Sequence, residues 1–296
     1  MKQSFCNGST TPRWTGEVQV TENRKIAEKT WRISLKAPDF IPLISSGQFV
    51  MLRLIQRNDP LLGRPFAIYS IDLQTETVDI VYLTVGKMTQ QLTEIRPGDR
   101  LELWGPLGNG WNEMKKSWTR SNCPEHLIMV AGGIGQTPFY LLSQEILAEN
   151  QNSEKAIRTF PSKLSLLFGA QTKSRFSCLD DFERLGIDVH LTTEDGSAGQ
   201  KGLITSIIPN IVEKSGCSEA KTVIAACGPH PLLKAVALLA QNQKMECWTS
   251  LESSMACGLG ICFSCVIKYR DDQGQWDYRR TCVDGPVFNA ARLCWD

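Results

Sequence analysis

The chain has 296 residues, a length that suggests about two domains. Its 32 Lys and Arg residues balance 31 Asp and Glu residues, and a net charge of +1 argues against binding nucleic acid through a basic surface. The 42% of apolar residues can build a sizeable core, but no apolar run reaches the ~20 residues needed to cross a bilayer. The first residues lack the apolar stretch of a secretory signal, so we expect a cytoplasmic protein without a membrane anchor.

Residues 1–13 are polar and without periodicity, and we expect a flexible arm there. Residues 14–112 then show short β-branched or alternating segments separated by Gly, Pro, Asn or Asp, a pattern typical of a β-barrel. The expected strands are Glu17–Val20, Thr30–Lys36, Gly47–Leu54, Ala67–Ile71, Thr77–Leu83 and Arg100–Leu103. Residues 113–125 are polar with clustered Lys and Arg, and we interpret them as a linker.

Within the barrel, the segment Arg64-Pro65-Phe66-Ala67-Ile68-Tyr69-Ser70 has the chemistry to hold a flavin. Arg64 offers a cation for a phosphate, Tyr69 a flat face and hydroxyl for an isoalloxazine ring, and Ser70 a donor for its heteroatoms. Downstream, Gly86-Lys87-Met88-Thr89 opens a short helical stretch that offers a second anion site. The alternative for the first segment taken alone is an exposed arginine and a core tyrosine.

Residues 126–248 alternate strands with helices, which predicts a parallel α/β nucleotide-binding domain. The expected strands are His126–Ala131, Lys163–Gly169, Ile187–Thr192 and Lys221–Ala226, and the expected helices are Pro138–Glu149, Leu179–Leu185, Leu203–Val212 and Leu232–Asn242.

Two turns of this domain are candidates for binding a nicotinamide dinucleotide. The first follows a buried strand and opens a helix; its candidate ligands are Gly132, Gly133, Gly135 and Thr137. Glycines let backbone amides approach a pyrophosphate there, although a tight strand–helix turn would also explain them. The second turn, Cys227-Gly228-Pro229, follows another strand. Since ligands bind beyond the carboxyl ends of parallel strands, both turns can line one crevice.

Residues 249–296 hold the most specific signal. Eleven cysteines cannot all pair, and four of them are Cys257, Cys262, Cys265 and Cys282. The spacing C-x4-C-x2-C followed by a distant fourth cysteine matches the plant-type [2Fe–2S] loop. The alternatives are a zinc site, which usually uses closely spaced pairs, or buried structural thiols.

Taken in order, these segments resemble the ferredoxin–NADP reductase superfamily. The run Leu251–Cys262, the run Cys282–Phe288 and the segment Thr193–Ser197 resemble, within it, the electron-transfer subunits of class 1B dihydroorotate dehydrogenase. The resemblance covers nearly all of residues 14–296. Two departures are Met88, where the family usually has glycine, and Gly63 before Arg64.

The resemblance implies an α+β multidomain fold: a six-stranded antiparallel barrel that binds FAD, a parallel α/β domain that binds NAD, and a small Cys-rich extension with a [2Fe–2S] cluster. Flavin contacts would come from Arg64, Pro65, Phe66, Ala67, Val81, Tyr82, Leu83, Met88 and Thr89, and cluster ligands from Cys257, Cys262, Cys265 and Cys282. Lys173 and Arg175 are basic where an acidic residue would mark NAD most clearly, so NADP stays open.

The implied function is to carry electrons from the FMN of a separate dihydroorotate dehydrogenase catalytic subunit through [2Fe–2S] and FAD to NAD+, in pyrimidine biosynthesis. The implied assembly is a heterotetramer with two of each subunit. We identify no catalytic side chain of this chain's own. The alternatives are a reductase subunit of another complex, similar to a sulfhydrogenase gamma subunit or a ferredoxin–NADP oxidoreductase alpha subunit, and a metal-dependent scaffold without flavin.

Overall fold

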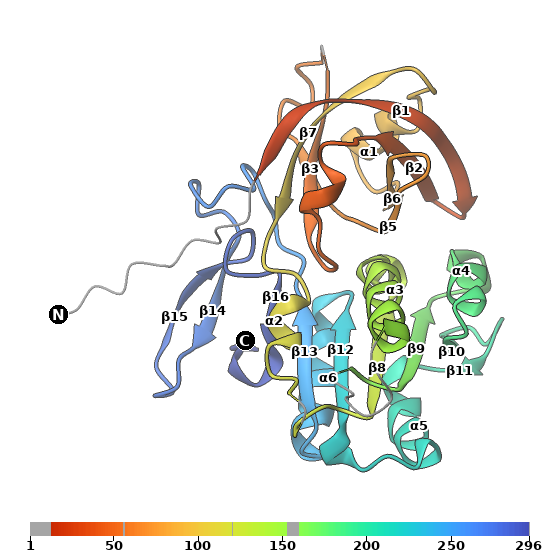
Figure 1. The fold of residues 1–296 in the computed structure, drawn as a ribbon, viewed down its shortest axis with the longest axis vertical. Helices are drawn as coiled ribbons and strands as arrows, with labels where there is room; N and C mark the ends of the chain where they lie inside the picture. Colours follow the sequence, from red (N-terminus) through yellow and green to blue (C-terminus); the bar gives the residue numbers. More distant parts are fainter. Residues whose placement is uncertain (1–12, 56, 120, 153–159, 296) are drawn as a thin grey trace.

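The computed structural model describes residues 13–55, 57–119, 121–152 and 160–295. Three parts lie side by side (Figure 1): a curled antiparallel sheet, a parallel sheet covered by helices, and a two-stranded hairpin beside both. The arm expected for residues 1–13 lies outside the described residues except for Arg13. The predicted combination of an antiparallel barrel, a nucleotide-binding α/β domain and a C-terminal extension is confirmed.

The barrel sheet contains seven strands in the order β4-β3-β7-β1-β2-β6-β5, so the expected count of six is wrong. Their bounds are β1 (Trp14–Ala27), β2 (Thr30–Lys36), β3 (Phe49–Leu54), β4 (Arg64–Ala67), β5 (Ser70–Asp72), β6 (Thr77–Leu83) and β7 (Arg100–Leu107). The extra strand arises because the expected strand Ala67–Ile71 is interrupted. At Ile68 and Tyr69 the chain passes from β4 at one edge of the sheet to β5 at the other. There Ile68 N donates to Gln48 O and Tyr69 N to Asp79 O, which closes the barrel.

Alternating apolar residues of the curled sheet fill the barrel interior. Ile33, Leu35, Val50, Ile80 and Leu103 are fully buried there. The helix α1 (Lys87–Leu92) adds Met88 and Leu92 to the same core, and a short turn of 3-10 helix covers Ile41–Leu43. The side chain of Met88 therefore points into the core, and this explains how a bulky residue is accommodated where the family usually has glycine.

The second sheet has the order β11-β10-β9-β8-β12-β13-β16 and is parallel except for β16. Its strands are β8 (His126–Gly132), β9 (Lys163–Ala170), β10 (Asp188–Thr193), β11 (Gln200–Lys201), β12 (Thr222–Cys227), β13 (Glu246–Ser250) and β16 (Val287–Asn289). Strands β8 and β12 are almost wholly buried, as central strands of a parallel sheet should be.

Helices cover both faces of this sheet (Figure 1): α3 (Thr137–Asn152), α4 (Leu179–Arg184), α5 (Ile208–Ser215) and α6 (His230–Asn242). Short 3-10 helices cover Gly133–Gln136, Lys173–Arg175, Ile204–Ile207, Glu219–Lys221 and Ala290–Arg292. The described helices all fall short of the length and apolar character that a membrane crossing requires.

The segment expected to be a linker, residues 113–125, is largely packed. It follows Trp111, contains most of α2 (Asn112–Lys115) and buries Met114 and Trp118 in the core of the nucleotide domain. Trp111 stacks on Phe139 at 5.4 Å, and its Nε1 donates to Pro138 O. Met114 and Trp118 are separated by polar residues, and their spacing in the sequence does not predict that both are buried. Their burial depends on the packing of the nucleotide domain around them.

The C-terminal extension is tied into the second sheet. The hairpin of β14 (Val266–Arg270) and β15 (Trp276–Arg280) forms a sheet of its own, and β14 packs on the core of the nucleotide domain through Ile267 and Tyr269. Strand β16 pairs antiparallel with β13. Strand β13 itself runs across the expected boundary between residues 248 and 249. The cysteine-rich segment therefore begins as a direct continuation of a nucleotide-domain strand.

His126, at the start of β8, makes the stability of the nucleotide domain depend on pH. The ring is fully buried, Nε2 lies 2.8 Å from Ser165 Oγ, and Nδ1 has no hydrogen-bond partner among the described residues. Burial, with a contribution from Lys163, lowers the pKa of His126 to about 4. An unfolded histidine takes up its proton near a pH of about 6.5, so the folded state loses stability as the pH falls from there toward the folded pKa.

We expect the wild-type protein to lose about 2 kcal/mol more unfolding free energy than His126→Gln between a pH of about 7.5 and one of about 5. Urea denaturation of both proteins at the two pH values measures the difference. Equal losses in the two proteins would contradict the assigned cause.

Candidate functional site

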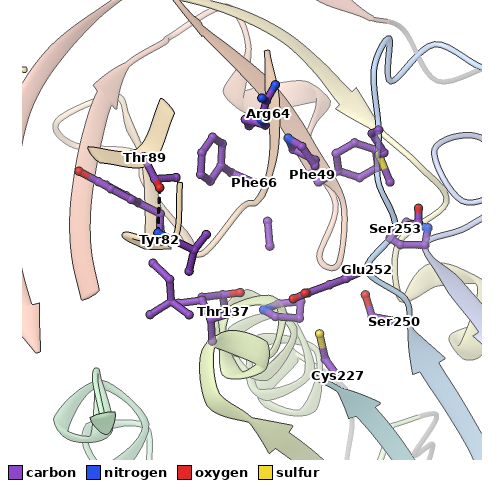
Figure 2. Close-up of a pocket in the computed structure, with 18 of the residues that line it drawn as sticks. Phe49, Arg64, Phe66, Tyr82, Thr89, Thr137, Cys227, Ser250, Glu252 and Ser253 are labelled. Carbon is purple, nitrogen blue, oxygen red and sulfur yellow. Dashed lines mark hydrogen bonds between the residues drawn. The ribbon is translucent and has the colours of Figure 1, made fainter. Parts of the chain in front are cut away.

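A cavity of about 630 Å³ lies between the barrel, the nucleotide domain and the start of the cysteine-rich segment. Figure 2 shows Phe66 of the barrel facing Thr137 and Cys227 of the nucleotide domain across it. The remaining side is formed by residues that follow β13, among them Glu252 and Ser253. Three segments far apart in sequence thus build one site.

Most of the predicted flavin residues line this cavity: Arg64, Pro65, Phe66, Ala67, Val81, Tyr82, Leu83, Met88 and Thr89. Phe66 packs edge-on against Tyr82 with ring centroids 6.1 Å apart. Tyr82 donates from its hydroxyl to Asn23, and burial raises the pKa of that hydroxyl. Arg64 supplies a partly exposed guanidinium that, among the described residues, donates to the carbonyl oxygens of Leu62 and Gly63. An apolar pocket with a cation at its rim fits a flavin nucleotide.

Thr89 organises the turn that enters α1. Its Oγ1 accepts from the backbone N–H groups of Val85 and Gly86, at 3.0 and 3.1 Å, and donates to Gly86 O. A Cβ on Gly86 would meet no atom within 4 Å, so the backbone here faces open space. This turn could accept a phosphate group of the nucleotide at the cavity's edge.

Tyr69 and Ser70 do not line the cavity, and the flavin roles predicted for them are corrected. Both are buried. Tyr69 stacks on Tyr140 at 4.8 Å and donates to Asp181 at 2.7 Å, while Ser70 donates to Asp79 at 2.9 Å. Burial, with Cys178 and Asp181 nearby, raises the pKa of Tyr69. Both side chains point away because the chain crosses between β4 and β5 here, a change of direction that the sequence pattern does not reveal.

Two glycines, Gly135 after β8 and Gly228 after β12, allow the two turns to pack closely against each other. A Cβ on Gly135 would lie 2.1 Å from Cys227 O, and one on Gly228 would lie 3.0 Å from Gly132 Cα. The absence of a side chain at Gly135 and Gly228 lets the turns after β8 and β12 meet, which agrees with the alternative explanation that these glycines serve a tight turn. Gly133 differs, because its φ of +56° and the open space at its Cβ leave its backbone free to face a ligand.

A second cavity of about 420 Å³ opens at the carboxyl ends of β9 and β10. Gly132, Gly133 and Pro229 line this cavity, whereas Thr137 and Cys227 line the first one. Ile134 and Leu83 contribute to both. The two cavities are therefore neighbouring parts of one crevice, as expected for a dinucleotide that reaches a flavin. Gly135 and Gly228 face neither cavity.

The residues after β13 were not singled out as site residues from the sequence. Ser250, Glu252, Ser253 and Met255 all line the first cavity. Glu252 is open to the cavity but flanked by protein, and this partial burial raises its pKa. The nearby Cys227 thiol is buried, which raises its pKa as well. The signal that could have found them is their position directly beyond a parallel strand, where ligands bind.

The four candidate cluster cysteines come together as two pairs. Cys265 and Cys282 pack in one apolar group, and Cys257 lies close enough to Cys262 to contribute to the lowered pKa of its thiol. This arrangement fits a two-iron cluster, in which each iron takes two thiolates. Within the described ranges, no three Cys, His, Asp or Glu side chains surround a single metal position. Cys294 lies apart, with its backbone N–H bound to Lys268 O.

Local hydrogen bonds favour thiolate in this loop. The Leu259 N–H donates to Cys257 Sγ at 3.3 Å. Ser264, together with Cys257, lowers the pKa of the Cys262 thiol to about 6. The turns that make this possible pass through Gly258 and Gly260, whose φ angles of 70° and 82° suit glycine. A donor set of four thiols with N–H groups aimed at sulfur is what an iron–sulfur cluster requires.

The loop of residues 257–265, here called the cysteine loop, packs on the barrel wall beside the flavin-sized cavity. Phe49, Met51 and Leu107 of the barrel form one apolar group with Cys265 and Cys282. Trp104 Nε1 donates to Cys257 O at 3.0 Å, and Asn109 bonds the backbone of Asp284 and Val287. Phe49 and Met255 belong both to this group and to the cavity lining. The two candidate cofactor sites therefore share a wall.

Family models match three consecutive parts of the chain. The oxidoreductase FAD-binding domain matches residues 17–111, the oxidoreductase NAD-binding domain residues 129–237, and the iron-sulfur cluster binding domain of dihydroorotate dehydrogenase B residues 252–294. The three models fall on the barrel, the parallel sheet and the cysteine-rich segment, respectively.

Curated relatives match over nearly the whole length. The chain is 32% identical to the electron transfer subunit of dihydroorotate dehydrogenase B (NAD(+)) from Caldanaerobacter subterraneus, with 95% of this chain and 99% of that one covered. It is 33% identical to the subunit of the same name from Bacillus caldolyticus, with 93% and 96% covered.

Among solved structures, the chain resembles one from an NADH-dependent reduced ferredoxin–NADP oxidoreductase, with a TM-score of 0.75, 25% identity, and 94% of this chain and 90% of that one covered. A ferredoxin NADP+ reductase from Neisseria gonorrhoeae matches with a TM-score of 0.58 at 14% identity, with 77% and 91% covered, and shows the shared fold alone.

Substitutions at Phe66 and Tyr69 separate a cavity residue from a structural one. We expect Phe66→Ala to weaken FAD binding about tenfold, because it removes an aromatic wall of the cavity. Tyr69→Phe should keep its flavin but lower the unfolding free energy by about 1 kcal/mol, because the half-buried Asp181 loses a donor. Visible absorption of the purified proteins and urea denaturation measure both effects; loss of flavin from Tyr69→Phe would contradict this assignment.

Proposed function

The chain belongs to the family of electron transfer subunits of dihydroorotate dehydrogenase B, and we propose that it passes electrons from a separate catalytic subunit to NAD+ in pyrimidine biosynthesis. The observation that carries the proposal is the shared wall of Phe49 and Met255 between the flavin-sized cavity and the cysteine loop. Electron transfer requires short separations, and this wall holds the two candidate sites next to each other.

The cofactors are FAD, a [2Fe–2S] cluster and NAD, and the protein contributes their placement. When bound, the flavin exchanges a hydride with the nicotinamide and single electrons with the cluster. The side chains hold the reacting groups and exclude water. The cavity walls that meet at Phe66, Tyr82 and Cys227 are aromatic or apolar, so they suit a flat ring rather than a free anion.

For the flavin we propose contacts to Arg64, Phe66, Tyr82 and Thr89, with backbone contributions from Pro65, Ala67, Val81, Leu83 and Met88. For the nicotinamide dinucleotide we propose the crevice marked by Gly132, Gly133, Thr137, Cys227 and Pro229, with Gly135 and Gly228 shaping it. Support comes from the cavity lining and from the packing of the two turns against each other. For the cluster we propose Cys257, Cys262, Cys265 and Cys282 as ligands, on the basis of their pairing.

The relatives are named as subunits, which implies a catalytic partner for this family. We propose that the partner carries FMN, that it docks at the cysteine loop, and that two copies of each chain assemble into a heterotetramer. Leu259, Ile261 and Phe263 are exposed apolar side chains of that loop, and such a group is typical of a surface that another protein covers.

We also propose that the protein works in the cytoplasm. The ten cysteines in the described residues form no disulfide with one another, as expected where thiols stay reduced.

The function is tested by dihydroorotate-driven reduction of NAD+, with the anaerobically purified chain and the FMN dehydrogenase from the same genome. We expect activity only when both proteins are present, because this chain offers no side chain assigned to dihydroorotate chemistry. Loss of activity with flavin and iron both present would instead favour a reductase subunit of another complex, an alternative consistent with the similarity to the NADH-dependent oxidoreductase.

Cluster ligation is tested with Cys282→Ser and the matched variant Cys294→Ser. We expect Cys282→Ser to lose most of its iron and its cluster absorption, because one of the four thiolates is missing. Cys294→Ser should retain both, since Cys294 lies apart from the pairs. Iron analysis and visible spectra of both proteins provide the measurement, and iron loss from Cys294→Ser alone would contradict the assigned ligands.

Partner docking is tested at two apolar side chains that are equally exposed. Ile261 in the cysteine loop and Leu73 in the turn between β5 and β6 are both 76% exposed. We expect Ile261→Ala to weaken the complex with the catalytic subunit about tenfold, as a central interface residue should. Leu73→Ala should leave the affinity unchanged. Calorimetry on the cluster-loaded proteins decides, and unchanged affinity for Ile261→Ala would exclude this docking surface.

A further inference from the structure

Two charged side chains line the second cavity, Arg175 and Glu194. Arg175 ends the short helix Lys173–Arg175 that follows β9, the second strand of the nucleotide domain. In dinucleotide-binding folds the residues that meet the adenosine ribose lie in this region, where an acidic residue binds the 2′-hydroxyl and an arginine accommodates a 2′-phosphate. Taken alone, Arg175 would favour the phosphorylated dinucleotide.

The charge of Arg175 is already paired, because Glu28 of the barrel forms an ion pair with it. Its Nη2 lies 3.2 Å from Glu28 Oε1. Ser174 Oγ donates to the other carboxylate oxygen of Glu28, and the Glu28 N–H donates to Ser174 O at 3.0 Å. The hydrogen bond from Ser174 and the charge of Arg175 both lower the pKa of Glu28, so the carboxylate is ionised at neutral pH. Backbone, hydroxyl and guanidinium contacts thus fix one carboxylate beside the ribose region.

We propose that Glu28 determines nucleotide specificity by holding Arg175 away from a ribose 2′-phosphate, so that the chain selects the unphosphorylated dinucleotide. A 2′-phosphate would have to share the guanidinium with a carboxylate that already offsets its charge, and it would also face the negative charges of Glu28 and Glu194. The 2′-hydroxyl of the unphosphorylated ligand meets neither cost. The inference rests on the proposed function, because it requires a nicotinamide dinucleotide in this crevice.

The proposed choice between the two dinucleotides depends on residues of both the barrel and the nucleotide domain. Glu28 stands between β1 and β2, whereas Arg175 and Glu194 belong to the nucleotide domain. A change of specificity therefore requires no alteration of the nucleotide domain itself. It requires only the loss of one charge on the barrel.

The test compares Glu28→Gln with Glu22→Gln. Both changes remove one carboxylate near the same barrel strand, but Glu22 pairs with Arg24 and takes no part in the cavity. Isothermal titration of each flavin-loaded protein with 2′,5′-ADP and with 5′-AMP measures recognition of the 2′-phosphate without turnover. Relative oxidation of NADPH and NADH with ferricyanide as acceptor provides a second readout.

We expect Glu28→Gln to bind 2′,5′-ADP about tenfold more tightly, with 5′-AMP affinity unchanged, because the released arginine can pair with the phosphate. The double variant Glu28→Gln/Arg175→Gln should lose this gain, and Glu22→Gln should match the wild type. Arg175→Gln alone should change little, which keeps the test valid should Glu28→Gln fold poorly.

Two results would overturn the proposal in distinguishable ways. If the wild type binds 5′-AMP and Glu28→Gln leaves the ratio of the two affinities unchanged, the specificity role fails and the proposed function stands. If the flavin-loaded wild type binds neither nucleotide and oxidises neither dinucleotide, the proposed function fails and the specificity role fails with it.

Discussion

The arrangement of the crevice depends on one buried polar network between barrel and nucleotide domain. Arg32 of β2 reaches Asp79 on the neighbouring strand and, at 3.2 Å, Asp181 of α4. Tyr69 donates to the same Asp181 and lies beneath the Arg32 guanidinium at 5.2 Å. Burial disfavours the charge of Arg32, but the two carboxylates more than compensate and raise its pKa. A half-buried carboxylate left without such partners would destabilise the folded chain, so the network favours this domain orientation.

Around this network, the barrel, the nucleotide domain and the cysteine-rich segment each contribute part of the crevice lining. The barrel supplies aromatic and apolar walls, the nucleotide domain supplies two tightly packed turns, and the segment after β13 closes the remaining side. On the other side of the barrel wall, Met51 and Leu107 pack against Cys265 and Cys282. The cysteine loop is therefore held by apolar contact as well as by its position in the chain, and the distance between the candidate cofactor sites is set by side-chain packing.

The sequence predicted the sites best where chemistry depends on local spacing. The C-x4-C-x2-C run has a spacing that few other structures require, whereas the glycine-rich turn after β8 is also explained by the close packing of two turns. Strands Thr30–Lys36 and Thr77–Leu83 match their predicted bounds, because each is a continuous segment between clear turn signals. The prediction was wrong at Ala67–Ile71, where hydrogen bonds that Ile68 and Tyr69 donate to Gln48 O and Asp79 O divide one apparent strand between two edges of the sheet.

By itself the sequence indicated the cysteine spacing of an iron–sulfur loop from ligand chemistry, and the resemblance of its motifs to a known family indicated the class of the protein and its other cofactors. Only the tertiary structure decided that Tyr69 bonds Asp181 across the domain contact, that Ser70 bonds Asp79 within the barrel, that Ser250 and Glu252 belong to the cavity, and that Glu28 meets Arg175. The reason is physical. Each of these outcomes depends on which side chains of distant segments share a small buried or half-buried space, and the packing of whole domains determines that.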